Sequence, residues 1–177
     1  MGSVQSQEIA ELFRRHGPSV YRRALRILGN AADAEEATQE IFVRALRSSE
    51  AFEQRSQLTT WLYQIATNYC LNLLRDHARR HALRAEHLPG GPAAQAPHAE
   101  EIALVRGLLA RADEREARAA VYVFIDGMSH EEAAELLGVS KRTVGNLVER
   151  FRAWAAAQSE ASTGEPLVAL ASSGGGS

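Results

Sequence analysis

Five polar residues recur at three- or four-residue steps between positions 64 and 79, a spacing that places them on one side of a helix. They are Gln64, Asn68, Asn72, Arg75 and Arg79. Amide side chains hydrogen-bond the edges of nucleobases, and guanidinium groups neutralise phosphates. The pattern therefore indicates a surface that contacts nucleic acid.

The most basic run of the chain continues from this surface. It contains Arg75, Arg79, Arg80, Arg84 and two histidines, His77 and His81. The histidines have the i, i+4 spacing that metal sites use, but no third ligand is evident. Phosphate contact is the favoured interpretation, and we expect neither a metal nor a cofactor.

A second candidate nucleic-acid site lies between Gly127 and Arg152. Ser129 and Glu132 have the spacing of a capping box, Gly138 can adopt the positive φ of a tight turn, and Ser140 can cap the next helix. This is the pattern of a DNA-binding helix-turn-helix, although a helical hairpin with an ordinary polar face is the alternative. The predicted contact residues are Ser140, Lys141, Arg142, Thr143, Asn146 and Arg150, with Arg152 near the DNA backbone.

Catalytic motifs are not found. The chain has no G-x-S-x-G, no phosphate-binding glycine loop and no H-E-x-x-H, so we expect a non-enzymatic protein. The formal net charge of −2 does not suggest a nucleic-acid binder, but local patches, and not the net charge, set the field at a binding surface.

Helical spacing of apolar residues recurs along the chain, without lasting strand-like alternation, and predicts an all-α fold. Gly17-Pro18 is expected to interrupt the first apolar stripe, and Gly29-Asn30 to end the second. Further helices are predicted at 32–48, from Thr59 onward, over the apolar residues from Ile102 to Ile125, at 129–137 and at 141–157.

The division into parts follows from composition. A Pro/Gly/Ala-rich linker is predicted at 86–99, between helical domains at 1–85 and 100–158, with a flexible tail at 159–177. The single cysteine, Cys70, is expected to be a buried hydrophobe. No run reaches the length that spans a bilayer and the N-terminus lacks signal-peptide features, so we expect a cytoplasmic protein without membrane insertion.

Two blocks of the N-terminal half carry a family resemblance. They are Asp33-Ala34-Glu35-Glu36-Ala37-Thr38-Gln39-Glu40-Ile41-Phe42 and Thr60-Trp61-Leu62-Tyr63-Gln64-Ile65-Ala66-Thr67-Asn68. They resemble region 2 of the extracytoplasmic-function (ECF) sigma factors of bacterial RNA polymerase, and the helix-turn-helix stands where region 4 lies in that family. The resemblance implies two small helical domains, a region 2 bundle and a region 4 helix-turn-helix, joined by a flexible linker.

The resemblance also implies roles for these residues. The helix carrying Asp33, Glu36, Gln39 and Glu40 is expected to dock on a coiled coil of the largest subunit of core RNA polymerase. The loop before Trp61, with Asn68 and the polar side described above, is expected to hold the opened −10 strand, and the helix-turn-helix to read the −35 duplex. Trp61 itself is favoured as a core and loop anchor. An anti-sigma factor is an implied further partner.

Two departures from the family pattern concern base reading. Gln64 stands where many members have Arg, and Gly145-Asn146 follows Thr143-Val144 where a basic residue and Ser are usual. A glycine inside a helix costs about 1 kcal/mol relative to alanine. It can allow close backbone approach or simply weaken the −35 contact.

Two other functions remain open. A non-sigma helix-turn-helix regulator would use the second site alone and would bind duplex DNA without polymerase. A degenerate sigma homologue that sequesters a partner would keep the docking helix but start no transcripts.

Overall fold

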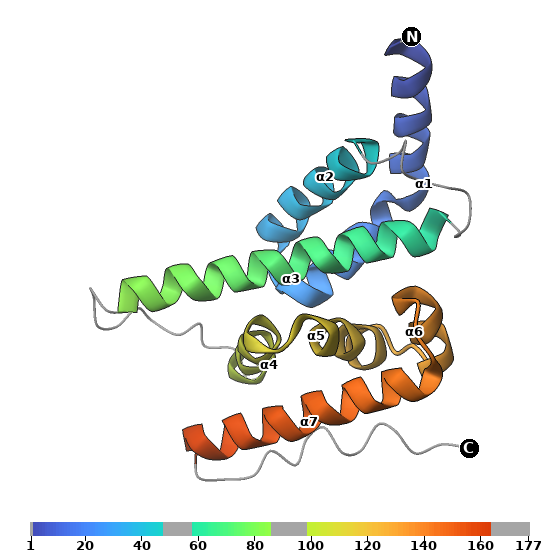
Figure 1. Cartoon of the computed structure of the whole chain (residues 1–177). Helices are drawn as coiled ribbons and strands as arrows, with labels where there is room; N and C mark the ends of the chain where they lie inside the picture. The colour runs from blue at the N-terminus through green and yellow to red at the C-terminus, as the bar shows by residue number, and fades with distance from the viewer. Residues whose placement is uncertain (1, 48–57, 86–98, 164–177) are drawn as a thin grey trace.

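The computed structural model describes residues 2–47, 58–85 and 99–163, and every regular element in these ranges is helical (Figure 1). The all-α fold class predicted from the sequence is therefore confirmed. The elements are α1 (Gly2–Leu28), α2 (Ala31–Arg47), α3 (Leu58–Ala85), α4 (Ala99–Arg111), α5 (Glu114–Ala120), the π-helical turn η2 (Val121–Ile125), α6 (His130–Leu137) and α7 (Lys141–Thr163).

The predicted linker and tail fall largely outside the described residues. Ala99, assigned to the linker from the sequence, is the first residue of α4. The sequence also places the start of the tail at Ser159, whereas α7 continues to Thr163 and Ser159 is buried. The division into two domains otherwise stays a prediction.

The predicted interruption at Gly17-Pro18 is wrong, because α1 runs through Pro18 without a break. A proline inside a helix removes one backbone hydrogen bond and commonly bends the helix without ending it. Figure 1 shows that α1 changes direction along its length. The ring of Phe13, one turn before Gly17, packs against that of Phe42 in α2 with ring centres 4.9 Å apart, so contacts between helices support the continuous α1.

The turn from α1 to α2 is built by Gly29 and Asn30. Gly29 has a φ of 78°, which favours glycine, and its N–H donates to the carbonyl of Leu25 at 2.8 Å. The Asn30 side chain accepts from the N–H of Asp33 at 2.7 Å and donates to the Asp33 carboxylate at 2.6 Å. The predicted helix end at Gly29-Asn30 is thus confirmed, although it closes the single long α1 and not a second helix, and Asn30 also caps α2.

The N-terminal helices pack through small residues on their facing sides. Ala24, Ala34, Ala37 and Ala66 are fully buried, which lets α1, α2 and α3 approach closely. Ile41 fills the space between them, and burying such a side chain contributes about 1.5–3 kcal/mol. This packing fixes which sides of α2 and α3 remain available for contacts.

The helix-turn-helix forms as predicted. Ser129 accepts from the N–H of Glu132 and donates its own N–H to the Glu132 carboxylate, completing the capping box. Gly138 ends α6 with a φ of 65°, and Ser140 accepts from the N–H of Thr143 at the start of α7. The inner stripe of α7 is buried at Val144, Leu147, Val148 and Phe151.

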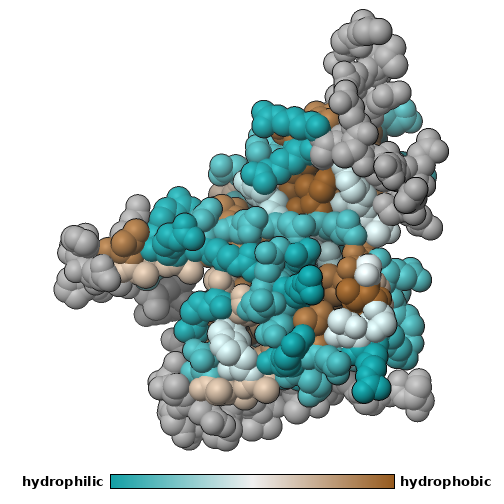
Figure 2. Space-filling view, in the orientation of Figure 1, coloured by the Kyte–Doolittle hydropathy of each residue, from teal (hydrophilic) through white to brown (hydrophobic). Residues whose placement is uncertain are grey.

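The two halves of the chain share a hydrophobic core. One cluster of buried residues includes Ile27 and Leu71 from the N-terminal half together with Leu108, Val121 and Phe151 from the C-terminal half. Figure 1 shows α3 lying between α2 on one side and α4, α5 and α6 on the other, with α7 as the outer layer. Hydrophilic residues cover most of the face shown in Figure 2.

Candidate nucleic-acid interface

The start of α7 presents an exposed polar surface on the side opposite its buried stripe. Lys141, Arg142, Asn146 and Arg150 are exposed, as a helix that enters a DNA groove requires. The hydroxyls of Ser140 and Thr143 lie 2.9 Å apart and take part in the cap, so they are partly committed to holding the helix start.

Two of these basic residues have acidic partners within the chain. Lys141 pairs with Glu131 of α6, and this hydrogen bond is the main reason why the pKa of Glu131 lies below its ordinary value. Arg150 Nε lies 3.4 Å from Glu116 Oε1. The Lys141–Glu131 pair is exposed, and exposed pairs contribute little stability, so Lys141 can exchange its carboxylate for a phosphate at small cost. In the second pair only Arg150 is exposed, whereas Glu116 is half-buried.

The structure clarifies the departure at Gly145. A Cβ built there would meet only the ring of His130, at 3.9 Å, which is ordinary van der Waals contact. Packing within the chain therefore does not require a glycine at this position of α7.

The acidic side of α2 divides into two kinds of residue. Glu36 and Gln39 are exposed, whereas Asp33 is half-buried, holds Asn30 and lies 3.6 Å from His77 of α3. Glu40 accepts from Arg44 at 3.1 Å, one turn along the helix. Asp33 thus has a structural task in the turn, while Glu36 and Gln39 lie open to a partner.

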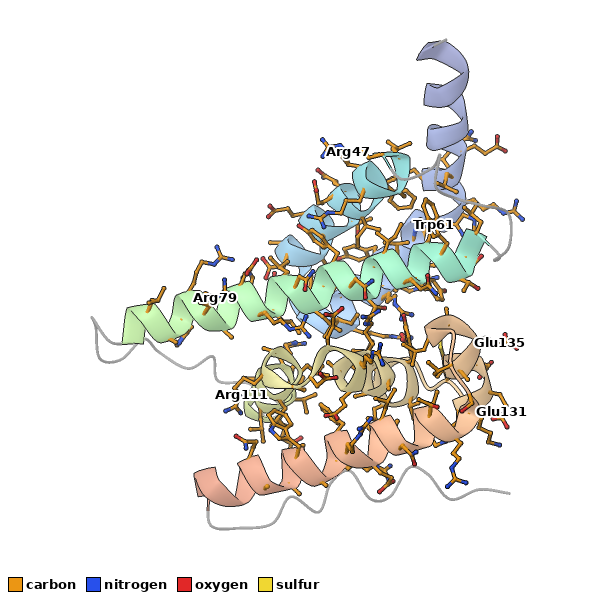
Figure 3. All side chains as sticks on the ribbon, viewed as in Figure 1. Arg47, Trp61, Arg79, Arg111, Glu131 and Glu135 are labelled. Atoms are coloured by element: carbon orange, nitrogen blue, oxygen red, sulfur yellow. The ribbon has the colours of Figure 1, made fainter. Side chains whose placement is uncertain are left out.

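The predicted polar side of α3 is not a single open surface. Asn72 and Arg79 are exposed, and Figure 3 shows Arg79 pointing away from the bundle. Gln64 faces the C-terminal half instead, because its Nε2 donates to the carbonyl of Leu136 in α6. Asn68 is half-buried, and its Oδ1 is shielded from solvent with no hydrogen-bond partner among the described residues.

The arginines on the polar side of α3 interact with neighbouring side chains of the same helix. Arg75 Nη1 donates to Asn72 Oδ1 at 3.0 Å, and Arg79 lies 3.9 Å from Asp76. Trp61 packs against the shared core near the start of α3 (Figure 3), in line with its expected anchoring role. The loop predicted to complete the −10 pocket lies outside the described residues.

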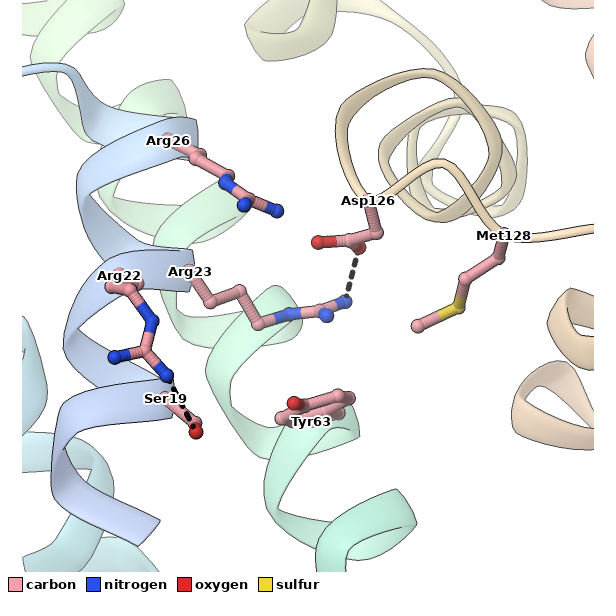
Figure 4. A pocket seen from close by; sticks show the side chains of 7 residues that line it. All are labelled: Ser19, Arg22, Arg23, Arg26, Tyr63, Asp126 and Met128. Atoms are coloured by element: carbon pink, nitrogen blue, oxygen red, sulfur yellow. Dashed lines mark hydrogen bonds and ion pairs between the residues drawn. The ribbon is translucent and has the colours of Figure 1, made fainter.

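A cluster around Arg23, which the sequence reasoning missed, joins the two halves; we call it the Arg23 cluster and define it as Arg23, Tyr63, Thr67, Tyr122 and Asp126. Arg23 is only 4% exposed, and its Nε and Nη2 donate to Thr67 Oγ1 at 3.1 and 2.8 Å. Its guanidinium lies 4.5 Å from the ring centre of Tyr63 and 5.2 Å from that of Tyr122. Asp126 Oδ2 is 2.8 Å from Arg23 Nη2 (Figure 4).

Burial dominates the electrostatics of this cluster. It raises the pKa of Asp126 above its ordinary value, and the nearby cations Arg23 and Arg26 oppose the rise only in part. It also raises the pKa of Tyr122, against a hydrogen bond with Thr67 and the charge of Arg23. The sequence contains one indication of this cluster: Arg23 is a charged residue on the same apolar side of α1 as Val20 and Ile27. A buried charge requires a partner.

A second polar contact joins the halves at the end of α1. Arg106 of α4 donates from Nε to the carbonyl of Ile27 at 3.0 Å, and burial lowers its pKa. A cation suits a helix C-terminus, where carbonyl groups lack partners and the helix dipole is negative. A Cβ on Gly29 would lie 1.6–2.1 Å from the Arg106 guanidinium, so this contact needs glycine there.

Other chemistry finds little support among the described residues. No group of three or more His, Cys, Asp or Glu side chains in the described ranges could hold a metal ion, and His77 faces Asp33. Cys70 is buried as expected, and burial raises the pKa of its thiol to about 12. Within residues 2–47, 58–85 and 99–163, no helix has the length and apolar content that crossing a membrane demands.

Family models match both halves of the chain. The model described as Sigma-70 region 2 matches residues 12–80, and the model described as Sigma-70, region 4 matches residues 102–154. The first match contains α2 and most of α3, and the second contains the helix-turn-helix. They stand in the order that the resemblance predicts.

Two curated relatives and one solved structure agree with these matches. The ECF RNA polymerase sigma factor SigE of Mycolicibacterium smegmatis is 40% identical over 152 residues, which cover 80% of this chain and 58% of that protein. SigM of Mycobacterium tuberculosis is 30% identical over 150 residues, covering 81% of this chain and 72% of the relative. The structure of CnrH in complex with the cytosolic domain of CnrY is 25% identical, with a TM-score of 0.53, and covers 89% of this chain and 91% of CnrH.

Both family models and both curated relatives indicate the same family. The chain belongs to the ECF family of RNA polymerase sigma factors.

Proposed function

We propose that the chain is an alternative sigma factor, which directs core RNA polymerase to selected promoters and assists opening of the −10 element. The observation that carries the proposal is the pairing of a region 2 bundle with a helix-turn-helix whose α7 start is exposed and basic. The chain supplies recognition, the polymerase performs the chemistry, and no cofactor of its own is needed. Its place of action is the cytoplasm, with the polymerase and the DNA.

Docking on core polymerase is assigned to α2. Glu36 and Gln39 are exposed one turn apart, and Asp33 and Glu40 flank them on the same side. A basic coiled coil of the largest subunit complements this surface. Such charge complementarity mainly sets orientation and association rate, so removal of one carboxylate slows assembly more than it changes the final complex.

Recognition of the −35 duplex is assigned to the start of α7. Arg142 and Asn146 are exposed and able to reach base edges, while Lys141 and Arg150 contact phosphates after releasing Glu131 and Glu116. A bidentate contact to a base contributes about 1–3 kcal/mol of discrimination. The hydroxyls of Ser140 and Thr143 hold the helix start and contribute contacts from its edge.

Capture of the opened −10 strand is assigned to α3. Asn68 has a shielded amide oxygen without a hydrogen-bond partner among the described residues, and Gln64 lies one turn before it. An unstacked base presents edge groups that such amides hydrogen-bond, at an unstacking cost of a few kcal/mol. Asn72, Arg75 and Arg79 continue the path for phosphates along the same helix.

A protein inhibitor is the remaining proposed partner. CnrH, which shares this fold, was solved in complex with the cytosolic domain of CnrY. An anti-sigma factor that covers α2 or α3 would block polymerase docking and promoter contact together.

Transcription by purified core polymerase on fragments of the source genome tests the proposal. Addition of the chain is expected to produce discrete new start sites. Glu36→Gln and Arg142→Ala are expected to reduce them several-fold, since each removes an exposed contact that no fold element needs. Glu35→Gln on α2 and Arg115→Ala on α5 are matched exposed controls that should keep full activity.

Two outcomes separate the alternatives. Tight binding to core polymerase without transcripts would favour a sequestering homologue. Tight binding of duplex DNA by the chain alone, with no binding to core polymerase, would refute the proposal and favour a non-sigma regulator.

A further inference from the structure

We propose that the pocket beside the Arg23 cluster binds a phosphorylated small molecule, whose phosphoryl group is held by Arg22 and Arg26 of α1. The pocket has a volume of about 290 Å³ and is lined by side chains of α1, of α3 and of the residues that follow η2 (Figure 4). None of these side chains belongs to the surfaces proposed above for core polymerase and promoter DNA. A ligand here would add to the proposed function, and its binding can be measured without polymerase or promoter.

The polar wall of the pocket comes from one face of α1. Ser19, Arg22, Arg23 and Arg26 all line the pocket, and they have the i, i+3, i+4, i+7 spacing that places side chains on the same face of a helix. From Ser19 to Arg26 this face is about 10 Å long, at 1.5 Å per residue. The helix period therefore gathers three guanidinium groups along a single wall.

Arg23 is the fixed inner part of this wall. It is only 4% exposed, its Nη2 donates to Thr67 Oγ1 at 2.8 Å, and the same nitrogen lies 2.8 Å from Asp126 Oδ2. The charge of Arg23 is therefore balanced within the chain. Tyr63, against whose ring the guanidinium lies, and Asp126 complete the inner end of the pocket.

Arg22 and Arg26 carry positive charge that the pocket does not balance. Both residues are exposed, and Arg22 Nη2 donates to a neutral partner, Ser19 Oγ, at 3.2 Å. Arg26 is close enough to oppose the rise in the pKa of Asp126, but it forms no ion pair among the described residues, and Asp126 is already paired with Arg23. Because three arginines line the pocket with one aspartate, an excess of two positive charges faces any ligand.

This excess of charge selects the class of ligand. Guanidinium groups bind the oxygens of carboxylates and phosphates through pairs of parallel N–H donors. A carboxylate carries a single negative charge, whereas a phosphate monoester carries about −1.5 to −2 near pH 7. A phosphoryl group therefore matches Arg22 and Arg26 better than a carboxylate does.

The remaining lining suits a small organic group attached to the phosphate. Met128 is half-buried, and Figure 4 shows its side chain directed into the pocket, above the ring of Tyr63. A methionine side chain is unbranched and adapts to irregular shapes. A volume of about 290 Å³ lies at the small end of ligand pockets, which span about 300–1,000 Å³. The expected ligand is therefore a small phosphorylated metabolite, and not a nucleic-acid strand, which needs an open groove.

Calorimetry on the whole chain measures this binding directly. The probes are glycerol 3-phosphate and pyrophosphate, titrated at constant ionic strength, and saturable binding at one site per chain is expected. Arg22→Gln and Arg26→Gln should each weaken binding about tenfold, because each removes a charge-assisted hydrogen bond. Arg14→Gln is the matched control, since it removes an exposed arginine from another side of α1 and should leave the affinity unchanged.

A measurement on the unaltered protein complements the variants. The methyl signal of Met128, one of the two methionines in the chain, should shift in the NMR spectrum as either probe saturates the pocket. The signal should stay in place in the Arg22→Gln/Arg26→Gln double variant. In folded Asp126→Asn, which lacks the carboxylate of the lining, both probes should bind several-fold more tightly, whereas a cation site would show the opposite change.

The outcomes separate this site from general attraction of anions and from promoter binding. Absence of saturable binding by both probes, or an equal loss of affinity in Arg14→Gln and Arg22→Gln, would overturn the proposal. Dependence of DNA binding on Arg22 and Arg26 without binding of either probe would also overturn it and would make these arginines a promoter contact. Saturable probe binding by a chain that produces no transcripts would support the pocket and refute the function proposed above.

Discussion

Replacing Gly29 by alanine adds a single methyl group and tests the contact between Arg106 and the end of α1. The residue has a φ of 78°, and the new Cβ would overlap the Arg106 guanidinium. Left-handed backbone costs an L-residue about 1–2 kcal/mol. The displaced Arg106 also loses its hydrogen bond to Ile27, worth about 0.5–1.5 kcal/mol. The free energy of unfolding should therefore fall by about 1.5–3.5 kcal/mol, the sum of both terms.

Gly138→Ala provides the matched control. Gly138 also has a positive φ, 65°, but a Cβ there would meet nothing within 4 Å. Both substitutions share the backbone cost and the change in the unfolded chain, so their difference isolates the Arg106 contact. Gly29→Ala should be more destabilising by about 1 kcal/mol, as measured by chemical denaturation.

A double-mutant cycle gives the sharper assay. Arg106→Ala alone should cost about 1 kcal/mol, and adding it to Gly29→Ala should cost almost nothing more, since the bond is already lost. The coupling energy is then about 1 kcal/mol. Costs that add to within about 0.3 kcal/mol would show that Gly29 and Arg106 do not act on one another and would refute the reasoning.

Three further predictions concern single residues. The Cys70 thiol should resist alkylation at pH 8 in the folded chain, because burial raises its pKa from 9.0 to about 12. Its contribution to the free energy of unfolding is complete below pH 9 and is lost by about 1.4 kcal/mol per pH unit as the pH rises toward 12. Denaturation measured over this pH range should show that slope for the unchanged chain and not for Cys70→Ala. Ser129→Ala should lower the free energy of unfolding by about 1 kcal/mol by removing the capping box, with little change for Ser129→Asp, which keeps an acceptor. Gly145→Ala should raise thermal stability by up to about 1 kcal/mol, because alanine favours helix and its Cβ fits against His130; a lower melting temperature would contradict this.

Local signals in the sequence were sufficient for the helix-turn-helix. Ser129, Gly138 and Ser140 each act on backbone groups within a few residues, so their spacing alone specifies where α6 begins and ends and where α7 begins. The apolar period likewise placed Val144 and Leu147 inside. The local rule failed at Pro18, because packing of α1 against α2, as in the contact between the Phe13 and Phe42 rings, outweighs one missing hydrogen bond in a long helix.

The relation between the two halves could not be read in the same way. Arg23 and Asp126 lie in different halves, and the residues around each of them do not indicate that the two side chains form a pair. The polar side of α3 was recognised, but a period of three to four residues does not tell whether water, DNA or the chain itself covers Gln64 and Asn68. The residues expected at the promoter were thus identified by type, while their surroundings required the fold.

The contacts between α1, α3 and α6 have a consequence for how the protein responds to its own abundance. Because both surfaces belong to one chain, their association is unimolecular, and dilution or overproduction leaves the fraction of chains with packed halves unchanged. Binding of core polymerase follows mass action instead. The balance between packed and separated halves is therefore set by the sequence alone, whereas the share of chains bound to polymerase depends on the concentrations of both partners.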